Sequence, residues 1–360
     1  MLLGRFDPAR WLTRTGQNDI LLSWRVTLYR NLDRFKFSSL MSEKDRKDLL
    51  VLFRNFIRVD SRLNRGVFVP FSDISQDEKD FLEEEGFVLS GETAAPDAAG
   101  LFLPEDGLSV ILNGAEHIAI RCHAESPAAA HAAADAVDDR LLAGFDIAFS
   151  DKIGFLTSSS NYLSNGLRIS ALLHLPGLKR SGRLKQVLQR SIQKGMIVRD
   201  FFGDSNLLLN DLVHFENGPE KYFLRNENDS LADFEHEVAD VVAEEKASRP
   251  GLAPIDLQDE IGRCLGLVAN AARLSLNESV YALGVLMLAA SMKSVPLDVA
   301  DLKRLFVMAH PGHLRALHGT RVDDQTEPVV RADLFRKLAR NRRMPFRQTP
   351  ADRSAAEKKG

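Results

Sequence analysis

Closely spaced strand-like runs are the feature that most constrains the fold of this chain. Between residues 100 and 226, short stretches rich in apolar and β-branched residues recur with few helical segments among them. The runs are GLFLP, LSVILN, IGFLT, LRISALLHLP, MIVRDFFG, DLVHFENG and KYFLRN. Helical patterns interrupt them at the alanine-rich residues 127–145 and again in SGRLKQVLQRSIQKG. Many strands with few crossover helices predict an α+β fold with an antiparallel or mixed sheet, and not a doubly wound parallel one.

One further strand-like run, VILNGAEHIAIRC at residues 110–122, is interrupted in its middle. Its apolar and polar side chains alternate as in a half-buried strand, except at Gly114 and Ala115. If the run is one strand, alternation directs Glu116 away from the face of residue 115, unless a bulge re-aims it.

The regions on either side of the strand-rich part have helical patterns. Residues 1–85 contain short amphipathic segments such as DRKDLLVLFRNFIRV, which predict a small helical N-terminal lobe. Residues 86–246 then form the α/β domain. ASRPGLAPID at 247–256 concentrates Pro and Gly and predicts a linker, and apolar periodicity beyond it predicts an all-helical domain at 255–345. We expect residues 346–360 to be a disordered tail.

Composition argues against several classes of function. The 47 Lys and Arg against 50 Asp and Glu leave a formal net charge of −3, which offers no general attraction to nucleic acid or to a membrane. The two cysteines, Cys122 and Cys264, lie in no paired or metal-binding pattern, so we expect no disulfide framework and no metal site. Together with the lack of a secretory leader or a long apolar span, this predicts a cytoplasmic protein.

Several stretches share one known pattern. DILLSWRVTLYRN (19–31), GFLTSSSNYLSNGLRISALLHLP (154–176) and MIVRDFFGD (196–204) resemble the phosphagen (guanidino) kinase family, and most closely its bacterial protein-arginine kinases. The resemblance continues through VILNGAEHIAI and into HPGHL at 310–314, so it covers nearly the whole chain in the right order. It implies a guanidino-kinase fold: an antiparallel sheet flanked by helices, and a C-terminal helical domain that supports dimerisation.

The resemblance also implies a reaction, the transfer of the γ-phosphoryl group of Mg-ATP to a guanidinium nitrogen. Arginines clamp the phosphates in such a reaction, while carboxylates hold the guanidinium and take its proton. The carboxylate is central because an arginine guanidinium is otherwise protonated in water.

The phosphate-binding side of the family pattern is partly kept. The family motif Ser-x-Arg-x-Arg appears here as Ser23-Trp-Arg25-Val-Thr27, which replaces the second arginine by threonine on the same strand face. Arg168 and Arg199 match two further phosphate arginines of the family. Ser23, Arg25, Arg168 and Arg199 are therefore the expected phosphate-binding residues.

The substrate side has changed more. Where the family has Asn-Glu-Glu-Asp-His-Leu-Arg, residues 113–119 read Asn-Gly-Ala-Glu-His-Ile-Ala. Gly114 and Ala115 thus replace two glutamates, the second of which is the family's catalytic carboxylate, and Ala119 replaces a phosphate arginine. Glu116 is left as a candidate substitute carboxylate.

Three further positions differ from the family. Ser159 stands where the family has a cysteine near the guanidinium, and Asp204 stands at a second substrate carboxylate, shorter by one methylene. The C-terminal phosphoarginine pocket of the protein-arginine kinases is marked by an Arg-Asp pair shortly before Arg-Ala. The matching stretch, Glu327 to Ala332, keeps Arg331 but lacks the Arg-Asp pair.

These changes predict a degenerate active site. Losing a general base costs roughly 10²–10⁴-fold in rate, and losing one charge-stabilising donor about 10²–10³-fold. The first hypothesis is a pseudokinase, a homodimer or heterodimer that serves as a regulatory or assembly partner of a kinase paralogue or of a zinc-finger activator. The alternative is an active ATP:guanido phosphotransferase, acting on protein arginine or a small guanidino substrate, in which Asp204 and Glu116 share the carboxylate work. Carboxylates that point into an arginine-lined cleft would favour the enzyme.

A structural role is the competing interpretation of the single residues. Outside the family pattern, Arg25, Arg168 and Arg199 would most simply be surface or salt-bridged arginines. His117, on a mostly apolar strand with no partner acid in the pattern, is more typical of a structural histidine than of a base.

Overall fold

The computed structural model of the 360-residue chain describes residues 9–89, 92, 99–104, 107–200, 211–222, 224–252, 254–318 and 322–341. The chain divides into two compact units: unit 1, Met1–Leu252, and unit 2, Ala253–Gly360.

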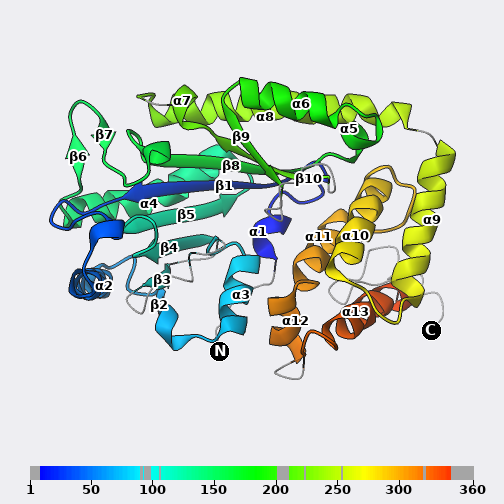
Figure 1. Ribbon diagram of the computed structural model, residues 1–360, viewed down its shortest axis with the longest axis horizontal. Coiled ribbons are helices and arrows are strands. Elements are labelled where there is room, and N and C mark those ends of the chain that lie inside the picture. Colours follow the sequence, from blue (N-terminus) through cyan, green and yellow to red (C-terminus); the bar gives the residue numbers. More distant parts are fainter. Residues whose placement is uncertain are drawn as a thin grey trace. The chain divides into compact units, whose positions relative to one another are not determined.

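Unit 1 is built on an antiparallel sheet, which has eight strands among the described residues (Figure 1). Their order is β2-β3-β4-β5-β1-β8-β10-β9, and every neighbouring pair is antiparallel. This sheet confirms the predicted α+β class. The strands are β1 (Leu21–Arg30), β2 (Val67–Pro70), β3 (Gly100–Leu103), β4 (Leu108–Leu112), β5 (Ile118–Ala124), β8 (Leu167–His174), β9 (Met196–Asp200) and β10 (Leu212–Asn217).

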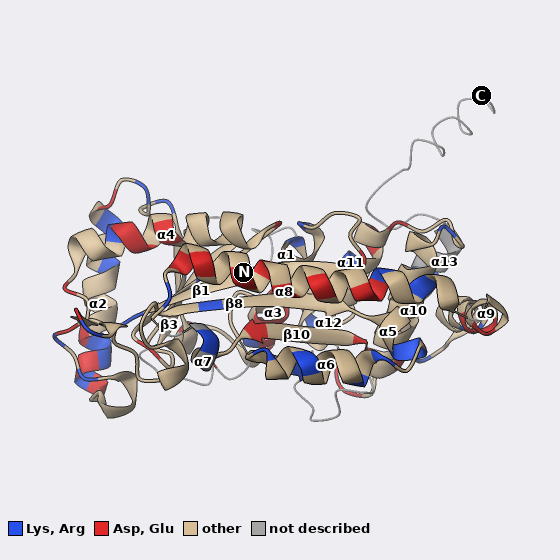
Figure 2. Ribbon diagram, turned by 90° about the horizontal axis from the view of Figure 1, so that it is seen from above, with Lys and Arg blue, Asp and Glu red and all other residues tan. Residues whose placement is uncertain are grey.

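Two long helices pack on this sheet. α4 (Pro127–Gly144) contacts β1 and β5, and α8 (Glu227–Ser248) contacts β8. Figure 2 shows α8 running between α4 and α6, with acidic residues along its length. Side-chain oxygens of Ser126 and Asn226 cap the first turns of α4 and α8. The shorter elements of unit 1 are α1 (Arg10–Thr13), α2 (Glu43–Val59), α3 (Gln76–Glu84), α5 (Pro176–Arg180), α6 (Leu184–Gln193), α7 (Pro219–Tyr222), the small strands β6 (Phe149–Ser150) and β7 (Gly154–Phe155), and the 3₁₀ turns η1 (Ser38–Leu40), η2 (Phe71–Asp73), η4 (Ser160–Tyr162) and η5 (Arg249–Gly251).

The two faces of the sheet differ in chemistry because successive strand residues point in opposite directions. Even-numbered residues of β1, such as Trp24 and Val26, are buried in the main apolar core with Val137 of α4 and Phe234 of α8. The rings of Trp24 and Phe234 lie 6.1 Å apart. This face therefore holds the helices to the sheet.

The opposite face is apolar at one end only. Near β2, β3 and β4 it carries a second, smaller apolar cluster, which includes Val69, Leu101, Ile111 and, from α3, Leu82. Towards β1, β8, β10 and β9, the same face carries the basic residues that the sequence pattern singled out.

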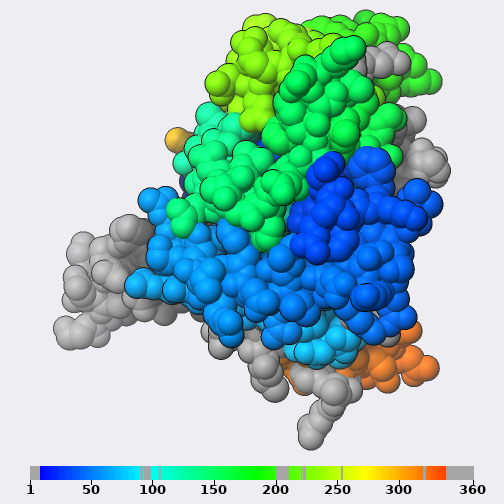
Figure 3. Space-filling view, turned by 90° about the vertical axis from the view of Figure 1, so that its left-hand side faces the viewer, coloured from blue at the N-terminus to red at the C-terminus, as the bar shows by residue number. Residues whose placement is uncertain are grey.

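The N-terminal residues are part of the main sheet. The helices expected within residues 1–85 are present as α2 and α3, but the structure has no boundary near residue 85, because β1 and β2 are strands of the sheet. Leu32 bridges to Ile147, and Asp60 accepts a hydrogen bond from Nε of Arg140 at 2.8 Å. Figure 3 shows the N-terminal residues, in blue, forming one continuous surface with green residues from the middle of the chain.

The run at 110–122 is a hairpin and not one strand. β4 ends at Leu112 and β5 begins at Ile118, and these two residues pair across the hairpin. Asn113 starts the turn with a φ of 56°, a left-handed conformation that asparagine tolerates better than most residues. Strand alternation therefore does not decide where Glu116 points. KYFLRN was also misassigned, because α7 (Pro219–Tyr222) ends within it.

The described residues of unit 2 form helices joined by short loops, with no strand among them. Its helices are α9 (Pro254–Asn270), α10 (Leu276–Ser291), α11 (Val299–Met308), α12 (Pro311–His318) and α13 (Glu327–Asn341). Ser275 and Glu278 form a capping box at the start of α10. The tail expected at 346–360 lies outside the described residues. None of the helices that the structure describes is both long and apolar enough to cross a membrane.

Candidate functional site

Basic side chains gather on the sheet face opposite the main core. The register places Thr27 of β1 opposite Arg168 of β8, and Arg25 opposite Ser170. Glu216 of β10 is opposite the same Ser170. Residues directly opposite each other in a sheet project to the same side. Three neighbouring strands therefore bring Arg25, Arg168 and Glu216 together.

Glu216 is the centre of this cluster. Its carboxylate forms a close ion pair with Nη2 of Arg168, and its Oε1 lies 3.6 Å from Nη2 of Arg25. Its Oε2 lies 3.7 Å from Nε of Arg199 on β9. Glu216 and Arg168 are buried, whereas the side chain of Arg199 is 57% exposed. The three arginines expected to bind phosphate thus converge on a carboxylate of the protein itself.

The charges in this cluster balance one another. Burial alone would raise the pKa of Glu216, but Arg168 and Arg25 lower it, and the net shift is downward. Burial, together with the charges of Arg168 and Arg121, lowers the pKa of Arg25 to about 10. Cations placed this close together need an anion among them, and Glu216 supplies it.

Two histidines of the same face are kept neutral. Burial and the charge of Arg25 lower the pKa of His214 to about 3, and the same two causes hold the pKa of His123 well below its usual value. The hydroxyl of Ser23 and Nδ1 of His123 are hydrogen-bonded at 3.2 Å. Ser23 is therefore engaged in positioning a histidine on this face.

Arg121 of β5 is a further arginine of this face, which the sequence analysis missed. It lies opposite Thr27 and two residues after Ala119, so it shares their face. Its Nη1 and Nη2 each donate to a different oxygen of Glu92 at 2.9 Å. The period-two spacing from Ala119 was the available signal, because strand residues i and i+2 point the same way.

The two positions at which the family pattern loses an arginine are closely packed. Thr27 is 1% exposed, and Ala119 is 5% exposed within the smaller apolar cluster. Tyr29, opposite Ala119, stacks on Tyr162 with ring centroids 4.2 Å apart. Nη1 of Arg168 donates to the hydroxyl of Tyr162 at 3.3 Å. Aromatic and apolar groups therefore adjoin these positions.

The carboxylate of Glu116, in the β4–β5 turn, is hydrogen-bonded to two other segments of the chain. Its Oε2 accepts hydrogen bonds from Nδ2 of Asn31 at 2.6 Å and from the N–H of Ser158 at 2.9 Å, and its Oε1 accepts one from the N–H of Ser159 at 3.1 Å. Glu116 is 1% exposed. These contacts give it a positioning role and do not favour it as a replacement base, contrary to the alternative hypothesis from the sequence.

The altered substrate-side positions meet around this turn. The hydroxyl of Ser158 donates to the carbonyl oxygen of Ala115 at 3.0 Å, beside Ser159. Ala115 is exposed, and a Cβ added to Gly114 would lie 3.5 Å from Cγ2 of Ile111, an ordinary contact. Packing around the turn therefore does not explain why the family's glutamates are missing at positions 114 and 115.

Two other expectations have different outcomes. Asp204 lies outside the described residues. His117 is structural, as its sequence context suggested: its Nδ1 accepts the N–H of Leu32 at 3.0 Å, and its Nε2 lies 2.7 Å from the carbonyl oxygen of Lys36.

The arginine matched to the phosphoarginine pocket is also engaged within the protein. Arg331 in α13 is 1% exposed. Its Nε donates to the carbonyl oxygen of Ala309 at 2.7 Å, its Nη1 to that of Leu274 at 3.1 Å, and its Nη2 to Glu327. All three nitrogens of this guanidinium are thus bound within unit 2.

Two protein-family models match the chain. Residues 52–248 match the model of the ATP:guanido phosphotransferase C-terminal catalytic domain, and residues 254–349 match that of the C-terminal domain of the protein-arginine kinase McsB. Among curated proteins, the protein-arginine kinase of Geobacillus stearothermophilus is 29% identical over 94% of this chain and 97% of its own length. The protein-arginine kinase of Bacillus licheniformis is 27% identical over 91% and 93%.

Solved structures show the same fold. The duplicated taurocyamine kinase from Schistosoma mansoni with bound transition-state-analogue components has a TM-score of 0.54 and 21% identity, over 65% of this chain and 33% of that one. A lombricine kinase has a TM-score of 0.54 and 16% identity, over 69% and 72%.

Proposed function

This chain belongs to the ATP:guanido phosphotransferase family, and from that premise we propose that it is a catalytically silent member which acts by binding another protein. The fold of the family is kept, whereas the groups that perform its chemistry have been replaced or engaged elsewhere.

The observation that carries the proposal is the position of Glu216. It occupies the centre of Arg25, Arg168 and Arg199, the residues that the resemblance assigns to the nucleotide phosphates. An incoming phosphate would meet this carboxylate as a like charge. At about 4 Å and an effective dielectric constant near 20, two like charges repel by about 4 kcal/mol, or roughly a thousandfold in affinity. The donor set as it stands therefore fits Mg-ATP poorly.

The substrate side supports the same conclusion. At position 115, matched to the family's catalytic carboxylate, the chain has alanine, and the neighbouring Glu116 is hydrogen-bonded into the fold. Loss of the base alone costs roughly 10²–10⁴-fold, against kinase turnover of about 1–100 per second.

A protein partner in the cytoplasm is the proposed target. The chain matches the family models of both the catalytic-type domain and the C-terminal domain, which supports a role that uses the whole fold and not its chemistry. We propose that it pairs with an active kinase paralogue or a zinc-finger activator, as a homodimer or heterodimer. Co-purification with either class, followed by light scattering, tests this part.

The central experiment measures phosphoryl transfer from labelled ATP to free arginine and to an arginine-rich protein, with calorimetric titration of Mg-ATP on the same preparation. We expect no transfer, and Mg-ATP binding that is weak or absent. Binding without transfer would still be consistent with a silent, nucleotide-responsive regulator.

Variants make the result decisive. Transfer by the unmodified chain that disappears in Arg168→Ala and in Asp204→Asn would overturn the proposal, because it would show a rebuilt active site. Glu244→Gln is the matched control, since Glu244 lies on α8 and its partly exposed ion pairs are with Arg183 and Arg190 and not with the arginines of the cluster.

One observation favours the alternative, an active enzyme with a rearranged site. Arg121 adds a cation to the face that lost arginines at positions 27 and 119. If the alternative holds, Arg121→Ala reduces transfer to arginine, and Mg-ATP binding accompanies that transfer.

A further inference from the structure

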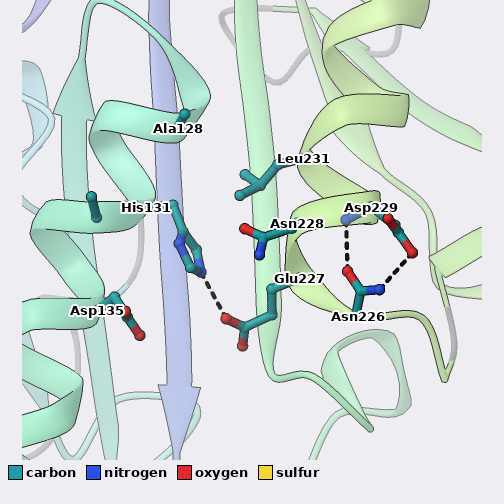
Figure 4. A pocket seen from close by; sticks show the side chains of 9 residues that line it. Ala128, His131, Asp135, Asn226, Glu227, Asn228, Asp229 and Leu231 are labelled. Carbon is teal, nitrogen blue, oxygen red and sulfur yellow. Dashed lines mark hydrogen bonds and ion pairs between the residues drawn. The ribbon is translucent and has the colours of Figure 1, made fainter.

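A second cluster of ionisable groups lies between α4 and α8, on the helical side of the sheet. His131 and Asp135 are four residues apart on α4 and so share one helix face. Glu227 is the first residue of α8. One ligand atom from each of the three lies within 4.8 Å of the others. Figure 4 shows the three side chains directed towards the same space.

The cluster borders an open pocket of about 700 Å³. Ala128, Asn228 and Leu231 are among the other residues that line it. His131 and Glu227 are partly exposed, with side-chain accessibilities of 12% and 25%. An ion could therefore reach the three groups from solvent, and water could fill the remaining coordination positions.

The local charge is unbalanced towards negative. Arg30 donates to Oδ2 of Asp138 from Nε at 3.0 Å and from Nη2 at 2.6 Å, so these two charges cancel. Glu227 has a longer contact with the same guanidinium, at 3.7 Å, and Asp135 has neither a hydrogen bond nor an ion pair with any residue that the structure describes. With His131 neutral, three carboxylates stand against one arginine.

The imidazole of His131 adjoins this excess of negative charge. Its Nε2 lies 2.7 Å from Oε2 of Glu227. A cation placed between the ring nitrogen and the carboxylates would offset the excess. Metal–ligand distances of about 2.0–2.2 Å for nitrogen and oxygen require these two atoms to separate slightly and the carboxylate of Asp135, whose ligand atom lies within 4.8 Å of them, to approach the same point.

We propose that His131, Asp135 and Glu227 bind a divalent transition-metal ion, with one imidazole nitrogen and two carboxylate oxygens as ligands. Imidazole favours ions of the zinc class over magnesium or calcium, so Zn²⁺ is the probe of choice. The site lies on the opposite side of the sheet from the arginine cluster. It would join the N-terminal turn of α8 to α4 and fix the helical layer, independently of the proposed function.

The test is calorimetric titration of Zn²⁺ into the full chain after treatment with chelator, with Co²⁺ absorption as a spectroscopic readout. We expect one strong site, Co²⁺ bands without thiolate charge transfer, and binding at least about tenfold weaker in Asp135→Asn and in His131→Ala. Binding should also weaken as the pH falls, because protons compete with the metal for the imidazole.

Asp139→Asn is the matched control, because it removes the same charge from an exposed position on α4. It should leave the affinity unchanged. No Zn²⁺ binding by the unmodified chain, or equal affinity in the variants of His131 and Asp135, would show an interhelical ion pair only and would overturn the proposal. The Co²⁺ spectrum of the unmodified chain keeps the test valid if a variant fails to fold.

Discussion

The carboxylate of Glu216 on β10 forms a buried ion pair with the guanidinium of Arg168 on the adjacent strand β8. This contact places a fixed negative charge where the family resemblance expects the negative charge of a nucleotide. Glu216 thus supplies the counter-ion of Arg168 and also lies near Arg25 and Arg199.

Removing this carboxylate should improve anion binding at the expense of stability. In Glu216→Gln, the arginines lose their internal anion, so we expect Mg-ATP to bind at least about tenfold more tightly, since a charge-assisted hydrogen bond is worth about 1.5–3 kcal/mol. Breaking a buried pair from one side should also lower the free energy of unfolding by about 3 kcal/mol. Calorimetry and urea denaturation measure the two effects. Unchanged Mg-ATP affinity would refute the view that Glu216 blocks the site.

The two altered family positions should differ in their tolerance of the family residue. Ala115→Glu places a carboxylate at an exposed turn and should change the free energy of unfolding by no more than about 0.5 kcal/mol. Ala119→Arg forces a cation into the smaller apolar cluster beside Tyr29 and should cost at least about 2 kcal/mol. Urea denaturation of both variants checks this contrast, which equal costs would contradict.

Glu116 should matter for stability and not for proton transfer. Glu116→Ala removes the acceptor of two backbone N–H groups and one of the two acceptors of Nδ2 of Asn31, which keeps its hydrogen bond to the carbonyl oxygen of Leu156. This loss should cost about 2–3 kcal/mol. Limited proteolysis should then cut more readily near Ser158. The conservative variant Glu116→Gln should recover part of the lost stability. If Glu116 acted as a base, phosphoryl transfer would instead be lost equally in both variants.

His214 should make the protein less stable in acid. The unfolded imidazole takes up a proton below about pH 6.5, but the folded one does so only near 3, because burial and Arg25 oppose the charge. The contribution of His214 to the free energy of unfolding is therefore fully present above about pH 6.5. It falls as the pH drops, by about 1.4 kcal/mol for each pH unit. His214→Gln should flatten this slope in urea denaturation between about pH 7.5 and 5.

In protein freed of metal with a chelator, His131 provides a control of opposite sign for that experiment. The pKa of His131 is raised by its bond to Glu227, so its contribution is present below about pH 6.5 and is lost as the pH rises through its folded value. His131→Gln should therefore destabilise the protein in acid more than at neutral pH. Parallel pH profiles for the two variants would contradict both assignments.

Local sequence pattern was enough to determine much of this protein. Short runs rich in apolar and β-branched residues located β3, β4, β8, β9 and β10, and helical patterns located α4 and α6. These assignments hold because strand and helix geometry dictate which neighbours share a face, whatever the rest of the chain does. The alternation of side chains along a strand also placed Arg25 and residue 27 on one face of the sheet.

Tertiary structure alone decided what that face contains. The sequence around Glu216 does not indicate that it pairs with an arginine. It contacts Arg168, 48 residues away in sequence, because the antiparallel register of β8 and β10 brings the two together. Alternation likewise did not decide the contacts of Glu116, since a turn that begins with a left-handed Asn113 breaks the period. Alternation specifies on which side of a sheet a residue lies, but the packing of strands and turns specifies which residues it contacts. Those contacts determine whether an arginine is available to bind a phosphate or is already paired within the protein.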